Sequence, residues 1–93
     1  MPHNNSNFRN QHLSVIWYAT GITGWLYNDK QTLAEITADG FFQEIKNLVE
    51  RGDRIYVSAT DGVADLYVTD KTTTVKTGVL NIKYYEPAQQ DKQ

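Results

Sequence analysis

The chain contains no cysteine and very little histidine, and both absences restrict the chemistry available to it. Without cysteine, its 93 residues can form neither disulfides nor thiolate metal sites. The only two histidines, His3 and His12, lie in a polar N-terminal stretch. We therefore expect no metal, no cofactor and no histidine acting as a general base.

Long apolar runs and blocks of like charge are also missing. No apolar run approaches the roughly 20 residues of a membrane-spanning helix, and the N-terminus lacks the basic and then apolar pattern of a secretion signal. We expect no membrane partner and synthesis in a cytoplasm. The formal net charge is −2, with nine Lys and Arg against eleven Asp and Glu interspersed along the chain. This balance attracts phosphate backbones only weakly, which disfavours nucleic acid as a partner.

A chain of this length can build only a thin core. It is expected to bury roughly 60 to 65% of the surface that its unfolded form exposes. Natural proteins of this size often add disulfides, a metal or partner subunits, and here only partner subunits remain. We therefore expect a homo-oligomer, with a trimer favoured over a dimer.

The two ends of the chain differ in composition from its middle. Residues 1–11 carry four Asn, with Phe8 as the large apolar side chain, and residues 86–93 are similarly polar. Such segments bury too little surface to offset the entropy lost on ordering. We predict a flexible polar arm over 1–11, a single domain over 12–85 and a flexible tail over 86–93.

The first half of the predicted domain favours short strands. Period-two alternation with β-branched and aromatic residues predicts a strand over 13–19, which the two glycines of 20–24 then break. Residues 25–27 fit another short strand. Residues 32–37 alternate weakly and are interpreted as a strand, with a helix over 31–37 as the alternative because Leu, Ala and Glu favour helices.

The clearest predicted element is an amphipathic helix over about 40–51. Asp39 precedes it as a good N-cap, and Gly52 follows as a C-terminal stop. The apolar residues that recur at the spacing of one helical face are Phe41, Ile45, Leu48 and Val49. This face is expected to supply much of the core.

Three strands are predicted after the helix, over 54–60, 63–69 and roughly 74–84. Asp61-Gly62 is a favoured two-residue hairpin turn, and Gly78 suggests a bulge or bend in the last strand. The side chains expected to be buried on the first two of these strands are Ile55, Val57, Ala59, Ala64, Leu66 and Val68. Antiparallel pairing is expected because the connections are short. The predicted fold class is α+β and mostly β: a small antiparallel sheet or partly open barrel, with one amphipathic helix followed by a three-strand meander.

No constellation of residues indicates catalysis. A nucleophile needs a base within hydrogen-bond reach that a third group orients, and the domain offers no cysteine, no histidine beyond residue 12 and no G-x-S-x-G motif. Asp61, Asp65 and Asp70 fall in one hairpin, but their spacing does not fit an EF-hand calcium loop. We predict that the chain is not an enzyme.

Aromatic residues are more numerous than so small a core needs, with six Tyr, two Trp and three Phe. Four of them flank the glycine break and form the candidate binding cluster: Trp17, Tyr18, Trp25 and Tyr27. Three interpretations stay open, namely core, a protein interface, where Tyr and Trp are enriched, and a platform on which a sugar stacks. In the N-terminal arm, Phe8 and Arg9 are candidate anchors that become ordered on assembly.

Residues 39–69 resemble a group of small bacteriophage proteins. The shared pattern is an aromatic pair that opens a helix, a Gly-Asp step into an aliphatic strand, an Asp-Gly turn and a strand that leads to Val-Thr. The matching positions are Phe41, Phe42, Gly52, Asp53, Ile55, Val57, Asp61, Gly62, Leu66, Val68 and Thr69. The resemblance covers about a third of the chain, and its motif is structural rather than catalytic.

Proteins of this group look like virion components, such as head decoration proteins or parts of the tail or fibre. The resemblance therefore implies a non-enzymatic phage structural protein that binds capsid or tail proteins and resides in the virion after synthesis in the host cytoplasm. The alternative is a carbohydrate- or small-ligand-binding module that uses the aromatic cluster. Head, tail and fibre locations all remain open.

Overall fold

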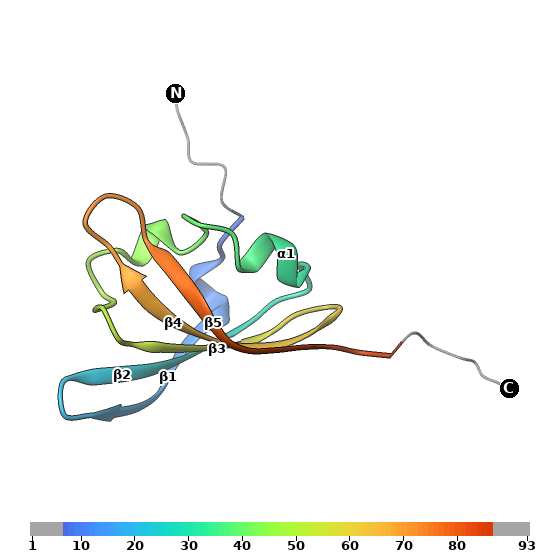
Figure 1. Ribbon diagram of the computed structural model, residues 1–93, viewed down its shortest axis with the longest axis horizontal. Helices are drawn as coiled ribbons and strands as arrows, with labels where there is room; N and C mark the ends of the chain where they lie inside the picture. The colour runs from blue at the N-terminus through green and yellow to red at the C-terminus, as the bar shows by residue number, and fades with distance from the viewer. Residues whose placement is uncertain (1–6, 87–93) are drawn as a thin grey trace, which may run out of the picture.

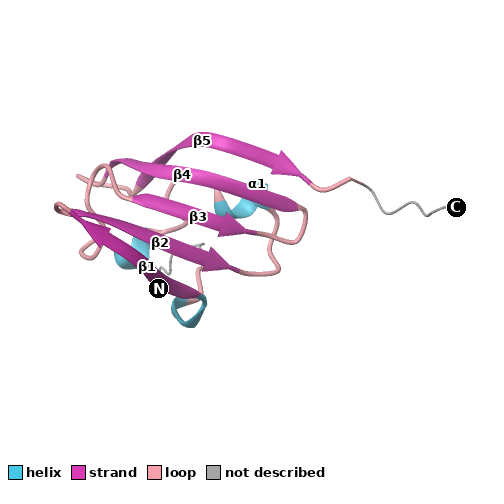
Figure 2. Ribbon diagram, turned by 90° about the horizontal axis from the view of Figure 1, so that it is seen from below, coloured by secondary structure: helices cyan, strands magenta, loops and turns pink. Residues whose placement is uncertain are grey.

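The strands of the molecule form one five-stranded open sheet, shown in Figure 1 and from below in Figure 2. The computed structural model describes residues 7–86. The strands are β1 (Leu13–Ala19), β2 (Ile22–Asn28), β3 (Arg54–Ser58), β4 (Gly62–Asp70) and β5 (Lys76–Tyr84). They lie side by side in the order of the sequence, so β1 and β5 are the two edges. The predicted α+β, mostly β class is confirmed.

One strand pair runs parallel, which corrects the expectation of antiparallel pairing throughout. Strands β2 and β3 are parallel, with Trp25 opposite Ile55, while the other three pairs are antiparallel. A parallel pair needs a crossover of a dozen or more residues, and residues 29–53 provide one. The prediction was wrong because it placed a strand over 32–37 within this stretch, so that the connections appeared too short for a crossover.

The crossover begins with a short helix, α1 (Leu33–Ile36), where the sequence favoured a weak strand. The strand was wrong, and the helical alternative is confirmed. Thr32 caps the helix: its side chain accepts a hydrogen bond from the Glu35 backbone N–H at 3.2 Å, and the Glu35 carboxylate accepts one from the Thr32 backbone N–H at 2.9 Å. This reciprocal capping box outweighs the period-two alternation.

The helix predicted over about 40–51 is not formed, and the segment folds as turns around one 3₁₀ helix, η2 (Gln43–Ile45). Isolated helices of this length are marginal, so tertiary contacts decide their conformation. Here the Gly40 N–H donates to the Val75 carbonyl at 2.9 Å and the Gln43 side chain accepts from the Val75 N–H at 2.8 Å. These bonds tie the segment to the β4–β5 loop, and Asp39 caps no helix.

The predicted apolar stripe of that helix is only partly buried. Phe41, Ile45 and Val49 are buried as expected, and Phe42 joins them. Leu48 is 59% exposed, because the turns that replace the helix direct it away from the sheet. The burial pattern was therefore more predictable than the backbone conformation that produces it.

Glycines and bulges shape the hairpins differently from the sequence prediction. Thr20 and Gly21 have positive φ and close the β1–β2 hairpin, whereas Gly62 has none and already belongs to β4. A Cβ at Gly62 would meet the β5 backbone, with Tyr84 Cα at 2.8 Å, so this glycine permits close strand approach. The bulge expected at Gly78 instead falls at Leu80, which has no partner between two paired positions.

The core lies between one face of the sheet and the layer formed by α1, η2 and the segment before β1 (Figure 1). All six strand residues expected to be buried are buried. Phe8 is also part of this core at 6% exposure, with its ring 5.2 Å from that of Tyr27. The arm predicted over 1–11 was thus too long, because Phe8 is packed within the domain. Residues 1–6 of that arm and 87–93 of the predicted tail lie outside the described residues.

Candidate functional site

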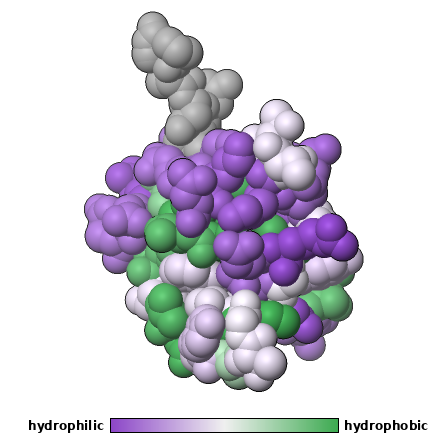
Figure 3. Space-filling model, turned by 90° about the vertical axis from the view of Figure 1, so that its left-hand side faces the viewer, coloured by the Kyte–Doolittle hydropathy of each residue, from purple (hydrophilic) through white to green (hydrophobic). Residues whose placement is uncertain are grey.

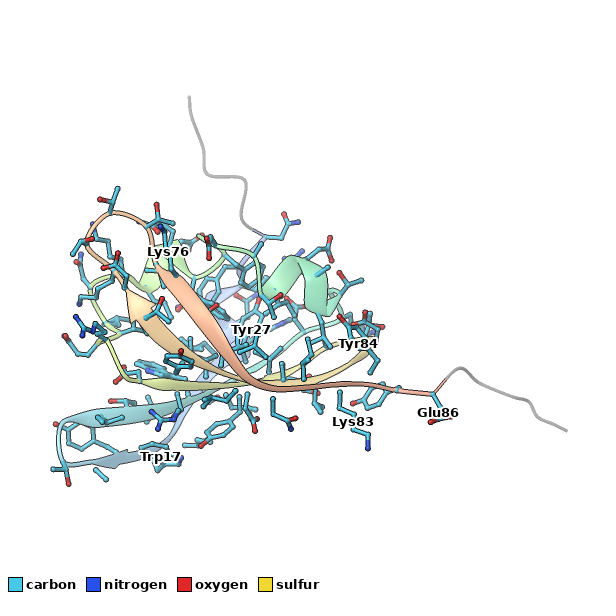
Figure 4. The ribbon with its side chains drawn as sticks, in the orientation of Figure 1. Trp17, Tyr27, Lys76, Lys83, Tyr84 and Glu86 are labelled. Atoms are coloured by element: carbon cyan, nitrogen blue, oxygen red, sulfur yellow. The ribbon has the colours of Figure 1, made fainter. Side chains whose placement is uncertain are left out.

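The face of the sheet opposite the helices carries no covering layer within residues 7–86, and we call it the open face. Successive strand residues point to opposite faces, so the neighbours of the buried Ile55 and Leu66 belong to it. Figure 4 shows Trp17 and Lys83 on this side and Tyr27 on the other. The open face includes Ser14, Trp17, Gly24, Leu26, Arg54, Tyr56, Val63, Asp65, Tyr67, Gly78, Asn81 and Lys83.

One row of residues crosses this face from edge to edge. The strand register aligns Trp17 with Gly24, Gly24 with Arg54, Arg54 with Tyr67 and Tyr67 with Gly78. An aromatic residue therefore stands opposite a glycine at each end, with an arginine between them. We call these five residues the aromatic row.

Both aromatic rings of the row lie across their glycines. A Cβ at Gly24 would meet three atoms of the Trp17 indole, among them Nε1 at 2.5 Å and Cδ2 at 2.6 Å. A Cβ at Gly78 would meet Cε1 of Tyr67 at 2.6 Å and Cζ at 2.7 Å. In each case at least two ring atoms lie within 2.7 Å of the position that the Cβ would occupy. Each ring therefore lies over its glycine and not beside it. Any larger residue at Gly24 or Gly78 would displace the ring.

The four residues of the predicted aromatic cluster do not form one surface. Trp17 is 38% and Tyr18 is 70% exposed, and as successive strand residues they point to opposite faces. Trp25 and Tyr27, at 8% and 0%, belong to the core. Of the four predicted residues, only Trp17 contributes to the open face.

Trp25 is held in place by a buried carboxylate. Asp53, 1% exposed, accepts hydrogen bonds from Trp25 Nε1 at 3.1 Å, from the Thr23 N–H at 3.0 Å and from the Glu50 N–H at 2.9 Å. It thereby joins β2 to the end of the crossover.

Arg9 and Tyr27 belong to a polar cluster that fastens the N-terminal segment to β2. Tyr27 Oη donates to Asp29 Oδ2 at 2.8 Å and accepts from the Arg9 N–H at 2.9 Å. Gln31 Nε2 donates both to Asp29 Oδ2 at 2.7 Å and to the Asn7 carbonyl at 2.9 Å. Arg9 Nε lies 4.0 Å from Asp29 Oδ2. In this structure both candidate anchor residues, Phe8 and Arg9, contact their own domain.

Two pKa values are shifted in this cluster. Burial raises the pKa of Tyr27 to about 12, so its hydroxyl stays protonated as a donor. Burial also acts to raise the pKa of Asp29, but hydrogen bonds from Gln31, Tyr27 and the Lys30 N–H outweigh it and hold that pKa below its usual value. Asp29 is therefore a charged acceptor in the folded protein.

The lowered pKa of Asp29 predicts a pH-dependent contribution to stability. Because the carboxylate is favoured in the folded state, its contribution is present above the unfolded pKa of about 4 and is lost as the pH falls through the folded value. Asp29→Asn should cost about 1 to 2 kcal/mol at neutral pH and should flatten the stability profile below about pH 4. Urea unfolding across this range measures both effects. Asp39→Asn, at an exposed site, is the control; an unchanged acid profile in Asp29→Asn would contradict the prediction.

Two shallow hollows adjoin the open face. One, of about 500 Å³, is lined by Gln11, His12, Ser14, Leu26, Asn28, Asp29 and Lys30. The other, of about 360 Å³, is lined by Arg51, Gly52, Tyr67, Val68 and Thr69. Both combine polar and apolar groups, and each includes residues of the open face. Across residues 7–86, no three His, Cys, Asp or Glu side chains are grouped so that they could hold a metal ion.

Arg54 and Tyr67 were not predicted as site residues, although the sequence contains a signal for their position. Both alternate with residues that were expected to be buried, so their exposure was implicit in the strand pattern. Their alignment with Trp17 was not, because it depends on the register of all five strands. That Gly24 and Gly78 lie opposite the two aromatic residues can be recognised only once that register is known.

Comparisons with known proteins give no further guide to this surface. Family models, curated proteins and solved structures all yield no match to the chain. In the described part of the chain, no helix is long and apolar enough to span a membrane.

Proposed function

We propose that the chain is a non-enzymatic structural protein of a phage particle, in which it binds capsid or tail proteins and other copies of itself. The resemblance of residues 39–69 to small phage proteins supports the class of protein. The distribution of exposed apolar side chains supports the binding role. This distribution is the observation on which the proposal depends.

The exposed apolar residues concentrate on the two edge strands. Of the 13 large hydrophobic residues exposed in the described chain, four lie on β1 and four on β5. They are Val15, Ile16, Trp17, Tyr18, Val79, Leu80, Ile82 and Tyr84. Figure 3 shows hydrophobic atoms in the lower part of one side of the molecule, where the β1–β2 hairpin lies, beneath a more hydrophilic region. Apolar surface gathered in this way is typical of protein interaction sites.

The bulges in both edge strands favour partner binding through side chains and disfavour the addition of another strand. Edge strands present unpaired backbone groups to which another strand can add, and bulges are one device that limits such addition. Strand β1 has a register shift between Val15 and Trp17, and β5 has its bulge at Leu80. We therefore propose that partners pack against the apolar side chains of each edge. A ring of three copies, favoured over a dimer, uses both edges of every subunit.

The β5 edge offers the sharper test of this proposal. Val79 and Leu80 are 49% and 57% exposed, so replacing both with lysine should place two charges in the interface without disturbing the core. The double variant is expected to be monomeric by size-exclusion chromatography with light scattering and to be absent from purified particles. The unmodified chain is expected to be oligomeric and present in stoichiometric amounts by mass spectrometry.

A matched control separates the edge from the rest of the surface. Val63→Lys introduces one lysine at a 38% exposed position on the interior strand β4, and it should leave assembly unchanged. A strictly monomeric wild-type chain with no affinity for shell or tail proteins would overturn the proposal. So would a chain that is found in infected cells and never in released particles.

A further inference from the structure

The aromatic row has the features of a ligand platform, and of its five residues only Trp17 also belongs to the edge residues proposed for assembly. Trp17 exposes 38% of its surface although its indole covers Gly24, and Gly24 is itself buried beneath it. Tyr67 covers Gly78 in the same manner. Because the rings lie on the sheet, each presents one of its faces outwards. Two such faces flank Arg54, which belongs to the same row.

The separation of the two rings suits an extended ligand. Gly24 and Gly78 lie on β2 and β5, three strand spacings apart, which places the covered positions about 14 Å from each other. A ligand that contacts both rings must therefore contain several linked units. The hollow next to Tyr67 and the hollow next to Leu26 provide further room along the same face.

Polar groups occupy the space between and beside the rings. Arg54 Nη1 donates to the Gly52 carbonyl at 2.6 Å. This hydrogen bond holds the guanidinium group in place, and the group carries five N–H donors in all. The next row on the open face contains Ser14, Leu26, Tyr56, Asp65 and Asn81. It supplies both donors and acceptors within reach of a ligand lying across the sheet.

We propose that the open face binds an uncharged oligosaccharide, with Trp17 and Tyr67 as stacking platforms and Arg54 as a hydrogen-bond donor between them. A pyranose ring presents C–H groups on its flat face, and these suit the negative face of an aromatic ring. Its hydroxyl groups suit the polar residues of the adjoining row. The proposal concerns the open face and is tested separately from the assembly role, because the β5 edge variant leaves Trp17, Arg54 and Tyr67 in place.

The charges of the face favour a sugar over a nucleic acid. Stacking on aromatic rings also occurs with unpaired bases, but such sites combine the rings with a positively charged groove. Here Asp65 lies in the row next to Arg54, and the whole chain carries a net charge of −2. Rings that lie flat also differ from the aromatic anchors of protein interfaces, which insert into pockets of the partner.

The test begins with binding of the full chain to an array of neutral gluco-, manno-, galacto- and xylo-oligosaccharides. Titration of the best ligand, followed by tryptophan fluorescence and calorimetry, then gives an affinity for each variant. Trp17→Ala and Tyr67→Ala are each expected to weaken binding about tenfold or more, while Trp17→Phe retains part of the affinity. Leu48→Ala removes a 59% exposed apolar side chain of the crossover, which lies on the other side of the sheet, and should leave the affinity unchanged.

A second variant tests the position of the ring separately from its presence. Gly24→Ala keeps Trp17 but adds a Cβ in the space that the indole occupies, so it should also weaken binding. Circular dichroism and thermal unfolding show whether each variant is folded. Failure of the array to retain the chain overturns the proposal, as does equal loss in Leu48→Ala. Preferential binding of a single-stranded oligothymidylate would assign the rings to nucleic acid instead.

Discussion

The Asp53→Ala variant is expected to lose about 3 to 5 kcal/mol of unfolding free energy, the largest effect of any single substitution proposed for this chain. The carboxylate is 1% exposed and accepts hydrogen bonds from Trp25 Nε1 and from the Thr23 and Glu50 N–H groups. Alanine would leave these three donors without their acceptor. Each buried donor left unpaired costs about 1 to 3 kcal/mol. Small domains have only about 5 to 15 kcal/mol of stability in total, so much of it would be lost.

Urea unfolding followed by circular dichroism and tryptophan fluorescence measures this loss. Asp53→Asn keeps one carbonyl oxygen and should fall between the wild type and Asp53→Ala, because it retains an acceptor for some of the three donors. Asp39→Ala, at an exposed site, is the matched control and should change stability by less than about 0.5 kcal/mol. If Asp53→Ala matches that control, the carboxylate does not hold β2 to the crossover.

The Phe8→Ala variant is expected to lose about 3 kcal/mol. Its ring packs against those of Tyr27, Phe41 and Phe42, with centroid distances of 5.2, 6.0 and 5.8 Å. Removal of the ring leaves a cavity lined by aromatic groups that belong to β2 and the crossover. The variant should also release the N-terminal segment, since burial of Phe8 and the hydrogen bonds that Tyr27 and Gln31 make to the backbone of Arg9 and Asn7 act on the same stretch of chain.

Thermal unfolding of the isolated chain tests this prediction and separates two roles for Phe8. A core residue lowers the melting temperature when it is truncated, and Phe8→Leu should restore most of the loss because it keeps apolar volume. An anchor that orders only on assembly would leave the isolated chain unaffected and weaken only its binding to particles. The second result would contradict the packing observed here.

Local patterns predicted the strands because the alternation of apolar and polar residues indicates directly which side chains face the core. Ile55, Val57, Leu66 and Val68 were expected to be buried and are. The same reasoning failed over 40–51, where helical spacing of apolar residues coincided with true burial but not with a helix. Hydrogen bonds that join Gly40 and Gln43 to Val75, which is distant in sequence, decided that backbone.

The candidate site was predictable only in part. The sequence drew attention to Trp17, which lies on the open face, and equally to Trp25 and Tyr27, which do not. Nothing local distinguishes these residues, since all three are aromatic and lie on neighbouring strands. The difference arises because the crossover and the segment around Phe8 cover one face of the sheet and leave the other without a layer.

The amino-acid sequence by itself determined that the domain is mostly β, which strand residues are apolar enough for the core, and that disulfides and thiolate metal sites are excluded. These properties depend on composition and on spacings of a few residues. Only the tertiary structure decided the parallel β2–β3 pair, the loss of the longer helix, the burial of Phe8 and the alignment of Trp17, Arg54 and Tyr67. Each of these depends on contacts between segments far apart in the chain, and a one-residue change of register moves a side chain to the other face of the sheet.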